Sequence, residues 1–319
     1  MNTFYVTGIK VVIIIDTQEK MDKLLPESGE YSSLETTFPS ESLEGVLFKG
    51  ISFNKPVYFD FLMSISSFRV IILKDCSFIF EDSTDTRIII ISVSEKVVID
   101  SCNFHNINFS IRSKSAHPKI FIENTIFDDE VTITSDNSGV TLIDIEVPML
   151  SLGYNKNYPL FIYRSTIDRS AITRSKYSEL DSNDVLIKES NIGSLFLLPY
   201  CTYIKDLNKG GSTFNSLFNN PGIKQLLLDC PVADCDLSGV SFSNAKFSGE
   251  NRGFENCNLS NADLSKISID IDSYTGSFYI ELYECEGLDT LKIRKDMKII
   301  QNTEESHVLV FKDSTDDNN

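Results

Sequence analysis

Three consecutive acids, Asp128, Asp129 and Glu130, are the residues of this chain with the clearest chemical potential. They follow the apolar segment IFIENTIF at 120–127. Grouped carboxylates can supply the general acid and the base or nucleophile that cleave glycosidic bonds. The pattern places no second acid or base beside them, and a turn that carries solvated acids has the same sequence. The chain also has no Trp to line a sugar cleft. We expect no catalytic residue.

The three histidines, His105, His117 and His307, lack the sequence spacing of metal ligands. His105 follows Phe104 at an expected corner of the chain, and His117 precedes Pro118 in a Ser-rich segment. The sequence contains no phosphate-binding loop, no dinucleotide-binding glycine motif and no nucleophile elbow. We therefore expect no metal-binding residue, no cofactor-binding residue and no cofactor.

Seven cysteines are present, an odd number without any CxxC pair. Cys230 and Cys235 are five residues apart, as are many apolar residues near them. This spacing predicts small buried hydrophobic side chains that stay reduced and bind no metal, which favours a reducing compartment. Cys201 and Cys285 lie off the repeat described next. The full set is Cys76, Cys102, Cys201, Cys230, Cys235, Cys257 and Cys285.

A five-residue period between Cys230 and Ile269 is the strongest signal in the sequence. A small or apolar residue lies two positions before most of the large apolar residues that mark the period. A chain that turns a corner after every five residues has this period, whereas a helix or a flat strand does not. Four such sides complete a coil, and coils stack at about 4.8 Å. The large residues are Val232, Leu237, Phe242, Phe247, Phe254, Leu259, Leu264 and Ile269.

This period predicts that Phe242, Phe247 and Leu264 are buried and point toward the axis of the stack. The tight corners are expected where Gly or Asn follows the large residue by two positions, as at Gly239 and Asn261.

A looser form of the pattern extends upstream. Each copy begins with two apolar residues on either side of a variable one. Two further residues, a small or apolar residue, one more residue and a final apolar residue follow, as in IILKDCSF at 71–78. Copies recur every 20 to 26 residues, which fits one coil of about 20 residues with short insertions at corners. The second apolar residues are Phe48, Leu73, Ile99, Ile122, Leu142, Ile162 and Ile187.

The repeat resembles that of the pentapeptide-repeat proteins, and NADLS at 261–265 is its plainest copy. The resemblance implies an all-β, right-handed parallel β-helix of quadrilateral section. The irregular copies resemble the β-helix module of bacterial type III secreted effectors. Some of those effectors use this module to bind the substrate of a HECT-like ubiquitin ligase lobe. Fewer than 50 residues follow the repeat here, so we expect the solenoid without the ligase.

Three regions follow from these patterns. Residues 1–44 are expected to form an N-terminal cap and loop, residues 45–271 the solenoid, and residues 272–319 a C-terminal cap or appendage with a frayed tail. Residues 4–15 look like a strand and residues 17–25 like a short helix. The apolar run Val11–Ile15 is too short for a signal peptide or a membrane span.

The chain is strongly acidic, with a formal net charge of −17. Such a charge repels nucleic-acid phosphates and anionic membranes, so the expected partner is another protein, with a basic surface. The first functional hypothesis is a non-enzymatic protein-binding solenoid, acting in the cytoplasm or secreted into a host cell by a non-Sec route. A DNA-mimicking inhibitor of a protein such as gyrase and a polysaccharide-active β-helix enzyme are the alternatives. The oligomeric state stays open.

Overall fold

The chain forms two compact units. The N-terminal unit comprises Met1–Ser170 with Glu189–Asn191, and the C-terminal unit comprises Ala171–Lys188 with Ile192–Asn319. In both, parallel strands stack coil upon coil, which confirms the expected all-β solenoid. The computed structural model describes residues 4–6, 9–11, 13–24, 45–55, 58, 62, 68–80, 87–93, 95–113, 119–135, 139–154, 159–174, 185–197, 204–205, 207, 209–248, 253–269, 279–294, 296–303 and 306–310.

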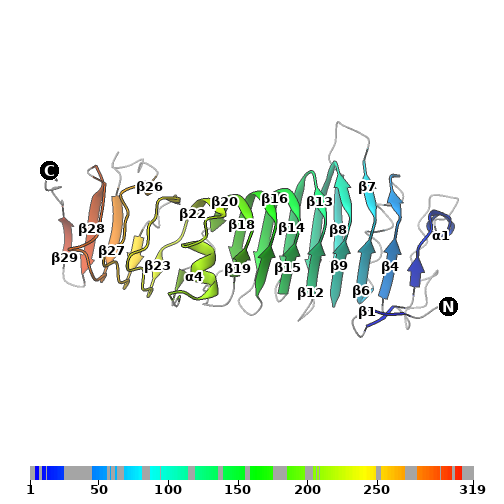
Figure 1. Ribbon diagram of the computed structural model, residues 1–319, viewed down its shortest axis with the longest axis horizontal. Coiled ribbons are helices and arrows are strands. Elements are labelled where there is room, and N and C mark those ends of the chain that lie inside the picture. The colour runs from blue at the N-terminus through cyan, green and yellow to red at the C-terminus, as the bar shows by residue number, and fades with distance from the viewer. Residues whose placement is uncertain are drawn as a thin grey trace. The chain divides into compact units, whose positions relative to one another are not determined.

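One side of the N-terminal unit is a parallel sheet, here called the first sheet, whose strands lie side by side in chain order (Figure 1). Each strand takes its shape from the apolar-x-apolar part of the repeat. Because side chains alternate along a strand, the two flanking apolar residues point inward and the residue between them points outward. The strands are β3 (Ile13–Ile15), β4 (Gly45–Lys49), β6 (Val70–Lys74), β9 (Lys96–Asp100), β12 (Lys119–Glu123), β15 (Gly139–Ile143) and β17 (Leu160–Tyr163).

The strands of the second sheet of this unit follow those of the first sheet in each coil. This sheet starts with short strands that carry the final apolar residue of the repeat and continues with longer ones. The short strands are β5 (Ser52–Phe53), β7 (Ser77–Ile79), β10 (Asn103–His105) and β13 (Ile126–Phe127). The longer strands are β8 (Arg87–Val93), β11 (Ile107–Ser113), β14 (Glu130–Ser135), β16 (Glu146–Tyr154) and β18 (Thr166–Arg174).

A residue in the left-handed backbone conformation makes the corner between the two sheets. Its N–H donates to a carbonyl of the next coil, as from Asp75 to Asp100 (2.9 Å) and from Asn124 to Ile143 (3.0 Å). A positive φ costs a residue with a side chain about 1–2 kcal/mol. Hydrogen bonds between coils offset this cost, so glycine is used at only one of these corners. The corner residues are Gly50, Asp75, Ser101, Asn124, Asp144, Arg164 and Glu189.

The interior of the N-terminal unit contains a stack of phenylalanines, one from each of four successive coils. Ring centroids are 4.5 Å apart for Phe53 and Phe78, 4.3 Å for Phe78 and Phe104, and 4.6 Å for Phe104 and Phe127. All four side chains are buried. The spacing matches the rise between coils, so parallel in-register pairing places like residue on like residue.

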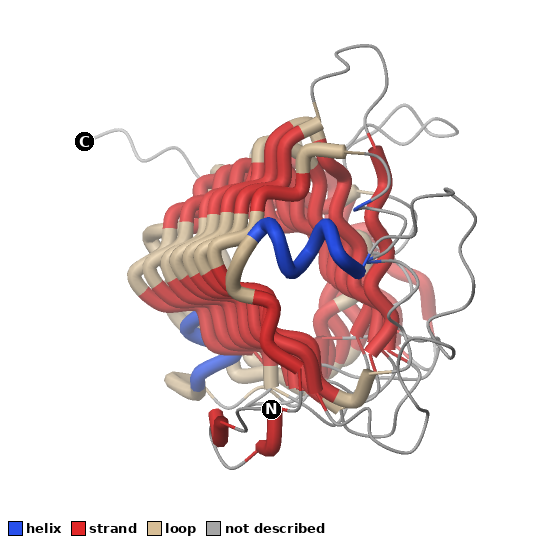
Figure 2. The backbone as a smooth tube through the Cα atoms, turned by 90° about the vertical axis from the view of Figure 1, so that its right-hand side faces the viewer, coloured by secondary structure: helices blue, strands red, loops and turns tan. Residues whose placement is uncertain are grey.

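Helix α1 (Gln18–Leu24) lies across the first coil of the N-terminal unit (Figure 2). Its Met21 is fully buried, and the side chain of Gln18 accepts a hydrogen bond from the backbone N–H of Ser52 (3.1 Å). The helix therefore covers a strand edge that would otherwise be open to pairing with another chain. An antiparallel pair, β1 (Phe4–Val6) and β2 (Ile9–Val11), precedes it. The expected helix is present, and three short strands occupy the segment 4–15 that was expected to be one strand.

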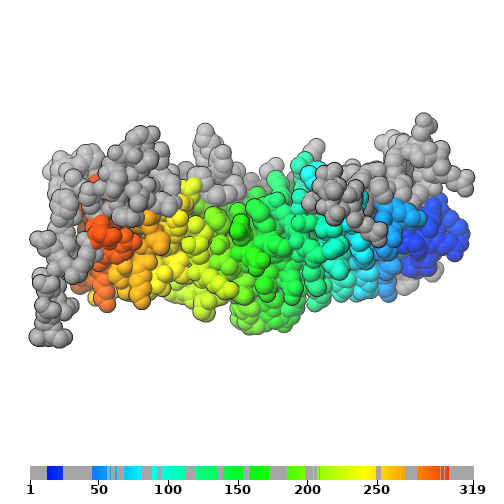
Figure 3. All heavy atoms as spheres, turned by 90° about the horizontal axis from the view of Figure 1, so that it is seen from above, coloured from blue at the N-terminus to red at the C-terminus, as the bar shows by residue number. Residues whose placement is uncertain are grey.

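Successive coils of the N-terminal unit form consecutive bands of colour in the space-filling view, from dark blue at α1 to green at β16 (Figure 3). Each coil thus contacts the coils before and after it in the chain, as in other solenoids.

In the C-terminal unit, helix α4 (Ser212–Leu217) packs against β19 (Val185–Lys188). The N–H of Val185 donates to Oγ1 of Thr213 (3.0 Å), and the N–H of Ile187 donates to Oγ of Ser216 (2.8 Å). Buried hydroxyls of the helix thus take the place of the carbonyls of another strand.

The five-residue period lies in the C-terminal unit and has the predicted orientation. Phe242, Phe247 and Leu264 are at most 1% exposed, which confirms their prediction. Gly239 and Asn261 have the positive φ expected at corners. The strands here are β20 (Asn191–Leu197), β21 (Ile204–Lys205), β22 (Ile223–Leu228), β23 (Val232–Ala233), β24 (Ala245–Phe247), β25 (Gly253–Glu255) and β26 (Ser268–Ile269), and all but β20 and β22 are short.

Parallel stacking continues past residue 271, where we expected the solenoid to end. Strand β27 (Tyr279–Tyr283) pairs in parallel with β25, and β28 (Lys298–Thr303) pairs in parallel with β27. Strand β29 (Ser306–Val310) is antiparallel to β28 and lies at the end of this sheet. Cys285 was expected to lie off the repeat, but the N–H of Glu286 donates to the carbonyl of Cys257 (2.9 Å), so Cys285 stacks on Cys257 of the previous coil.

The phenylalanine stack predicts a large loss of stability when Phe104 is replaced by Ala. Phe104 touches rings on both sides, so the change should lower the free energy of unfolding by about 3–5 kcal/mol. Ile88→Ala is the control, because Ile88 is 57% exposed and its loss should cost no more than about 0.5 kcal/mol. Urea unfolding followed by circular dichroism measures both values. Equal losses for the two variants would show that Phe104 is not inside the stack.

Candidate binding surface

The outward face of the first sheet carries a central column of side chains, all of them apolar except one threonine. Parallel pairing places the residue between the two inward residues of each strand next to its equivalent on the following strand. A sheet face that only meets water is usually polar at such positions. This central column consists of Ile14, Leu47, Ile72, Val98, Phe121, Thr141 and Phe161.

A groove of about 630 Å³ lies over this column from Leu47 to Thr141. Ile72 is only 5% exposed, and it forms a small apolar cluster with Val70, Leu47 and Val98 on this outer face. Phe121 is half-buried next to Val98. The groove therefore has an apolar floor that is separate from the interior of the coil.

One edge of the groove is positively charged. Lys96 and Lys119 are register neighbours on β9 and β12, and both side chains line the groove. The ammonium group of Lys96 lies 5.1 Å from the ring centroid of Phe121. Partial burial and, to a lesser extent, the charge of Lys119 lower the pKa of Lys96.

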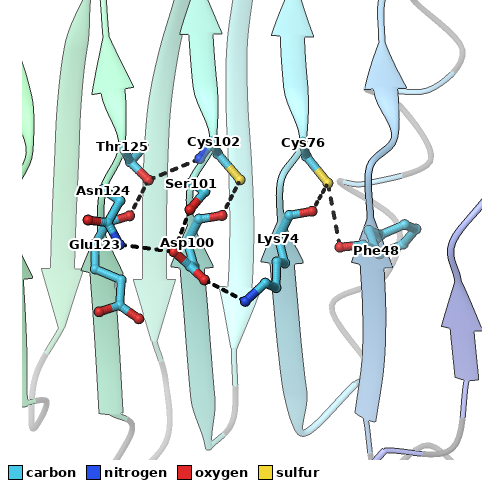
Figure 4. Close-up of polar contacts among 9 residues, drawn as sticks. All are labelled: Phe48, Lys74, Cys76, Asp100, Ser101, Cys102, Glu123, Asn124 and Thr125. Atoms are coloured by element: carbon cyan, nitrogen blue, oxygen red, sulfur yellow. Dashed lines mark hydrogen bonds and ion pairs between the residues drawn. The ribbon is translucent and has the colours of Figure 1, made fainter.

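On the opposite edge, Lys74 and Asp100 form an ion pair (Figure 4). Nζ of Lys74 lies 3.0 Å from a carboxylate oxygen of Asp100, and the side-chain amide of Asn124 donates to the same carboxylate (3.2 Å). Burial raises the pKa of Asp100, but hydrogen bonds from Lys74, Ser101 and Asn124 outweigh that effect and hold the pKa below its usual value. Glu123 continues this edge on β12.

A ladder of small side chains lies inside the corner behind this edge (Figure 4). The thiol of Cys76 donates to the carbonyls of Lys74 (3.2 Å) and Phe48 (3.5 Å). The N–H of Cys102 donates to Oγ1 of Thr125 (3.3 Å), and that hydroxyl donates to the carbonyl of Glu123 (2.7 Å). These contacts hold the strand ends in register, so the cysteines here have a structural role.

The six described cysteines form no disulfide, and five of them are buried. A hydrogen bond with Cys76 and burial raise the pKa of Cys102 well above its usual value. Cys285 differs, since it is half-buried and a hydrogen bond with Cys257 lowers its pKa although burial raises it. Cys201 lies outside the described residues.

The acidic run Asp128–Glu130 lies on the second sheet, away from the groove. Asp128 pairs with Nδ1 of His105 on the previous coil, a contact that the sequence did not indicate. Glu130 accepts hydrogen bonds from Thr132 (3.2 Å) and Ser151 (2.9 Å). A shallower groove of about 330 Å³ beside Asp128 also includes Glu146 and Asp168.

The structure thus brings His105 to Asp128 but does not bring Asp129 into that pair. In the described part of the chain, no cluster of His, Cys, Asp and Glu has the arrangement of a metal site. His117 lies outside the described residues, and so does the side chain of His307 on β29. No described helix combines the length and the apolar character needed to cross a bilayer.

A DNA-mimicking surface needs one continuous stripe of acids. The charged edge of the groove reads Lys49, Lys74, Asp100 and Glu123 from coil to coil, so half of this column is basic. In the C-terminal unit, Ser241, Asp263 and Lys292 are neighbours in another mixed column. These two columns therefore do not favour a DNA mimic.

The fold and this surface define a solenoid of a kind suited to presenting a flat face to a partner. In agreement, the family described as pentapeptide repeats matches residues 233–268 in eight copies. This match confirms the resemblance to pentapeptide-repeat proteins where the five-residue period is most regular. No curated protein and no solved structure matches the chain.

The sequence reasoning missed the groove, although its signal was present. The variable residue of the apolar-x-apolar triplet is itself apolar at Leu47, Ile72, Val98 and Phe121. The repeat assigns this position to the solvent side, so four apolar residues in succession at this position indicated a surface feature.

Thiol reactivity tests the contrast between Cys285 and the other cysteines. In a Cys201→Ser background, a water-soluble disulfide reagent should modify one thiol quickly and the remaining five only on unfolding. The reason is that Cys285 combines partial exposure with a lowered pKa, and the thiolate is the reactive form. Absorbance at neutral pH follows the reaction. If a further Cys285→Ser change leaves the fast phase intact, the assignment of the fast thiol is wrong.

Proposed function

We propose that this protein is a non-enzymatic, protein-binding β-solenoid that contacts its partner through the outward face of the first sheet. The observation that carries the proposal is the apolar column from Leu47 to Phe121, which forms the floor of a groove on the surface. Solenoid proteins commonly bind along such faces, because residues there vary without disturbing the ladder.

The column is not required by the coil itself. Thr141 occupies the same position on β15, so a polar residue is compatible with the fold. A surface groove with an apolar floor is uncommon on a monomer and usually marks an interaction site. Covering it contributes about 25 cal/mol per Å² of apolar area removed from water. The groove is therefore best explained by a partner that covers it.

The proposal also covers the kind of partner and the cellular compartment in which the protein acts. The resemblance to type III effector modules supports a factor that acts on a protein in the cytoplasm of its own cell or of a host cell. The net charge of −17 favours faster association with partners whose overall surface is basic, and weaker association at high salt. The apolar floor of the groove supports a binding role in preference to a catalytic one.

A pair of matched variants tests the binding function. Phe121→Glu places a charge on the floor of the groove, and Ile126→Glu places the same charge at a site on the second sheet that is 45% exposed. Affinity purification with quantitative mass spectrometry should identify a protein that the wild type and Ile126→Glu retain and that Phe121→Glu loses by roughly tenfold or more. Circular dichroism should show that both variants are folded.

Two outcomes would contradict the proposal. In the first, all three forms of the protein retain the same partners equally, which would place binding on another face. In the second, none of them retains a partner under conditions in which all are folded.

A further inference from the structure

Three cysteines of the C-terminal unit stack on successive coils and are here called the C-terminal thiol ladder: Cys235, Cys257 and Cys285. The N–H of Asn258 donates to the carbonyl of Cys235 (3.1 Å), and the N–H of Glu286 donates to the carbonyl of Cys257 (2.9 Å). Asn258 and Glu286 are partners in a parallel bridge. Each cysteine of the ladder is therefore the register neighbour of the next, one coil further along.

The three thiols have the same orientation. Each donates to the carbonyl of the residue two positions earlier in its own coil: Ala233 (3.0 Å), Glu255 (3.3 Å) and Tyr283 (3.5 Å). A further hydrogen bond joins the thiols of Cys257 and Cys285. The sulfur atoms of these neighbouring coils thus lie side by side.

The spacing of the coils suits a covalent bond between these two sulfur atoms. Register neighbours on parallel strands have α-carbons about 4.8 Å apart. The α-carbons of a disulfide usually lie about 4.4–6.8 Å apart, so Cys257 and Cys285 can be joined while their coils stay paired. The two cysteines are 28 residues apart in the sequence, and a disulfide across a loop of that size restricts the unfolded chain.

Exposure distinguishes this pair from the other stacked cysteines in the described part of the chain. Cys235 and Cys257 are 2% and 1% exposed, whereas Cys285 is half-buried. Cys76 and Cys102 stack in the same way, with a hydrogen bond between their thiols, but they are 2% and 3% exposed. Among the described cysteines, only the pair of Cys257 and Cys285 therefore combines stacking with a sulfur atom that a dissolved oxidant can reach.

We propose that Cys257 and Cys285 form a disulfide when the protein meets a hydroperoxide, and that Cys285 is the thiol that reacts first. The disulfide ties the coil of β27 to the coil of β25, whose strands are already paired in parallel. The resting protein keeps its cysteines reduced, as the sequence predicts. The groove of the first sheet takes no part in the reaction, so this proposal is independent of the binding function.

The reaction balances with the peroxide as the co-reactant. The thiolate of Cys285 attacks one peroxide oxygen, an S–O bond forms, the O–O bond breaks, and the departing oxygen takes a proton from water. The sulfur of Cys257 then attacks the sulfenic acid. An S–S bond forms, the S–O bond breaks, and the hydroxyl leaves as water with the thiol proton of Cys257. The two thiols lose two electrons, which reduce the peroxide to water, or to water and an alcohol.

The environment of each thiol fits its role. The hydrogen bond with Cys257 lowers the pKa of Cys285, against the effects of burial and of the charge of Glu255, and the thiolate is the form that attacks a peroxide. Hydrogen bonds with Cys235 and Cys285, together with burial, raise the pKa of Cys257. Cys257 therefore keeps its proton until the sulfenic acid forms beside it.

Mass spectrometry of the full chain tests the proposal, with hydrogen peroxide as the oxidant. The protein carries Cys201→Ser, the remaining thiols are alkylated under denaturing conditions after the reaction, and tryptic peptides are separated without reductant. We expect one crosslinked pair of peptides, joined through Cys257 and Cys285, which dithiothreitol separates. Cys76 and Cys102 are the matched control, and they should be recovered in the alkylated form.

Two serine variants separate the steps. Serine is compatible with the ladder position, because Ser165 and Ser190 occupy it in other coils, and circular dichroism should show that both variants are folded. Cys257→Ser should leave a sulfenic acid at Cys285, which dimedone traps. Cys285→Ser should slow the oxidation of Cys257 by roughly tenfold or more, because no half-buried thiol remains beside it.

Three results would overturn the proposal. The first is oxidation of Cys76 and Cys102 as fast as that of Cys257 and Cys285, since exposure would then not select the pair. The second is a sulfinic acid at Cys285, or a disulfide between the Cys285 residues of two chains, without the internal disulfide. The third is no oxidation of Cys285 at peroxide concentrations that oxidise free cysteine.

Discussion

In-register parallel pairing between neighbouring coils is the constraint on which the rest of the structure depends. Every strand residue in a coil lies about 4.8 Å from its equivalent in the next. The corner residues show how strongly this pairing acts. Asp75, Asn124 and Arg164 keep a positive φ without being glycine, and hydrogen bonds such as that from Asp75 to Asp100 hold the corner. The stack of Phe53, Phe78, Phe104 and Phe127 follows from the same pairing.

The same constraint shapes the surface. Because register is fixed, an outward position repeated over several coils becomes a straight column of side chains. Leu47, Ile72, Val98 and Phe121 form one such column, and Lys96 and Lys119 form part of another. A linear groove with an apolar floor and a charged edge therefore needs no loop or lid. Specificity can be encoded by substitutions on the outer face while the inward residues stay the same.

The sequence was sufficient to predict those features that repeat. The period of five predicted the burial of Phe242, Phe247 and Leu264, and the looser pattern predicted the inward residues of the first sheet. These predictions succeed because each coil imposes the same hydrophobic requirement on the chain. Within the N-terminal region expected at residues 1–44, residues 4–15 and 18–24 also have the predicted strand and helix character, since their apolar spacing is local.

Features that depend on a neighbouring coil were not predictable in this way. Cys285 continues the ladder of Cys257, but the insertion before it breaks the period of five. Helix α4 replaces a strand because its hydroxyls accept hydrogen bonds from the N–H groups of β19. The sequence does not show that these N–H groups need an acceptor, because this depends on which elements lie beside β19 in the folded chain. The contact between His105 and Asp128 likewise joins two coils that lie 23 residues apart in the chain.

Site-specific photo-crosslinking tests most directly the claim that the partner lies on the first sheet. A benzophenone amino acid replaces Thr141, at one end of the groove, or Ile126, on the second sheet. The account predicts a crosslink from position 141 to a partner segment that contains apolar residues, and little or none from position 126. Crosslinks from position 126 alone, or equally from both positions, would contradict it.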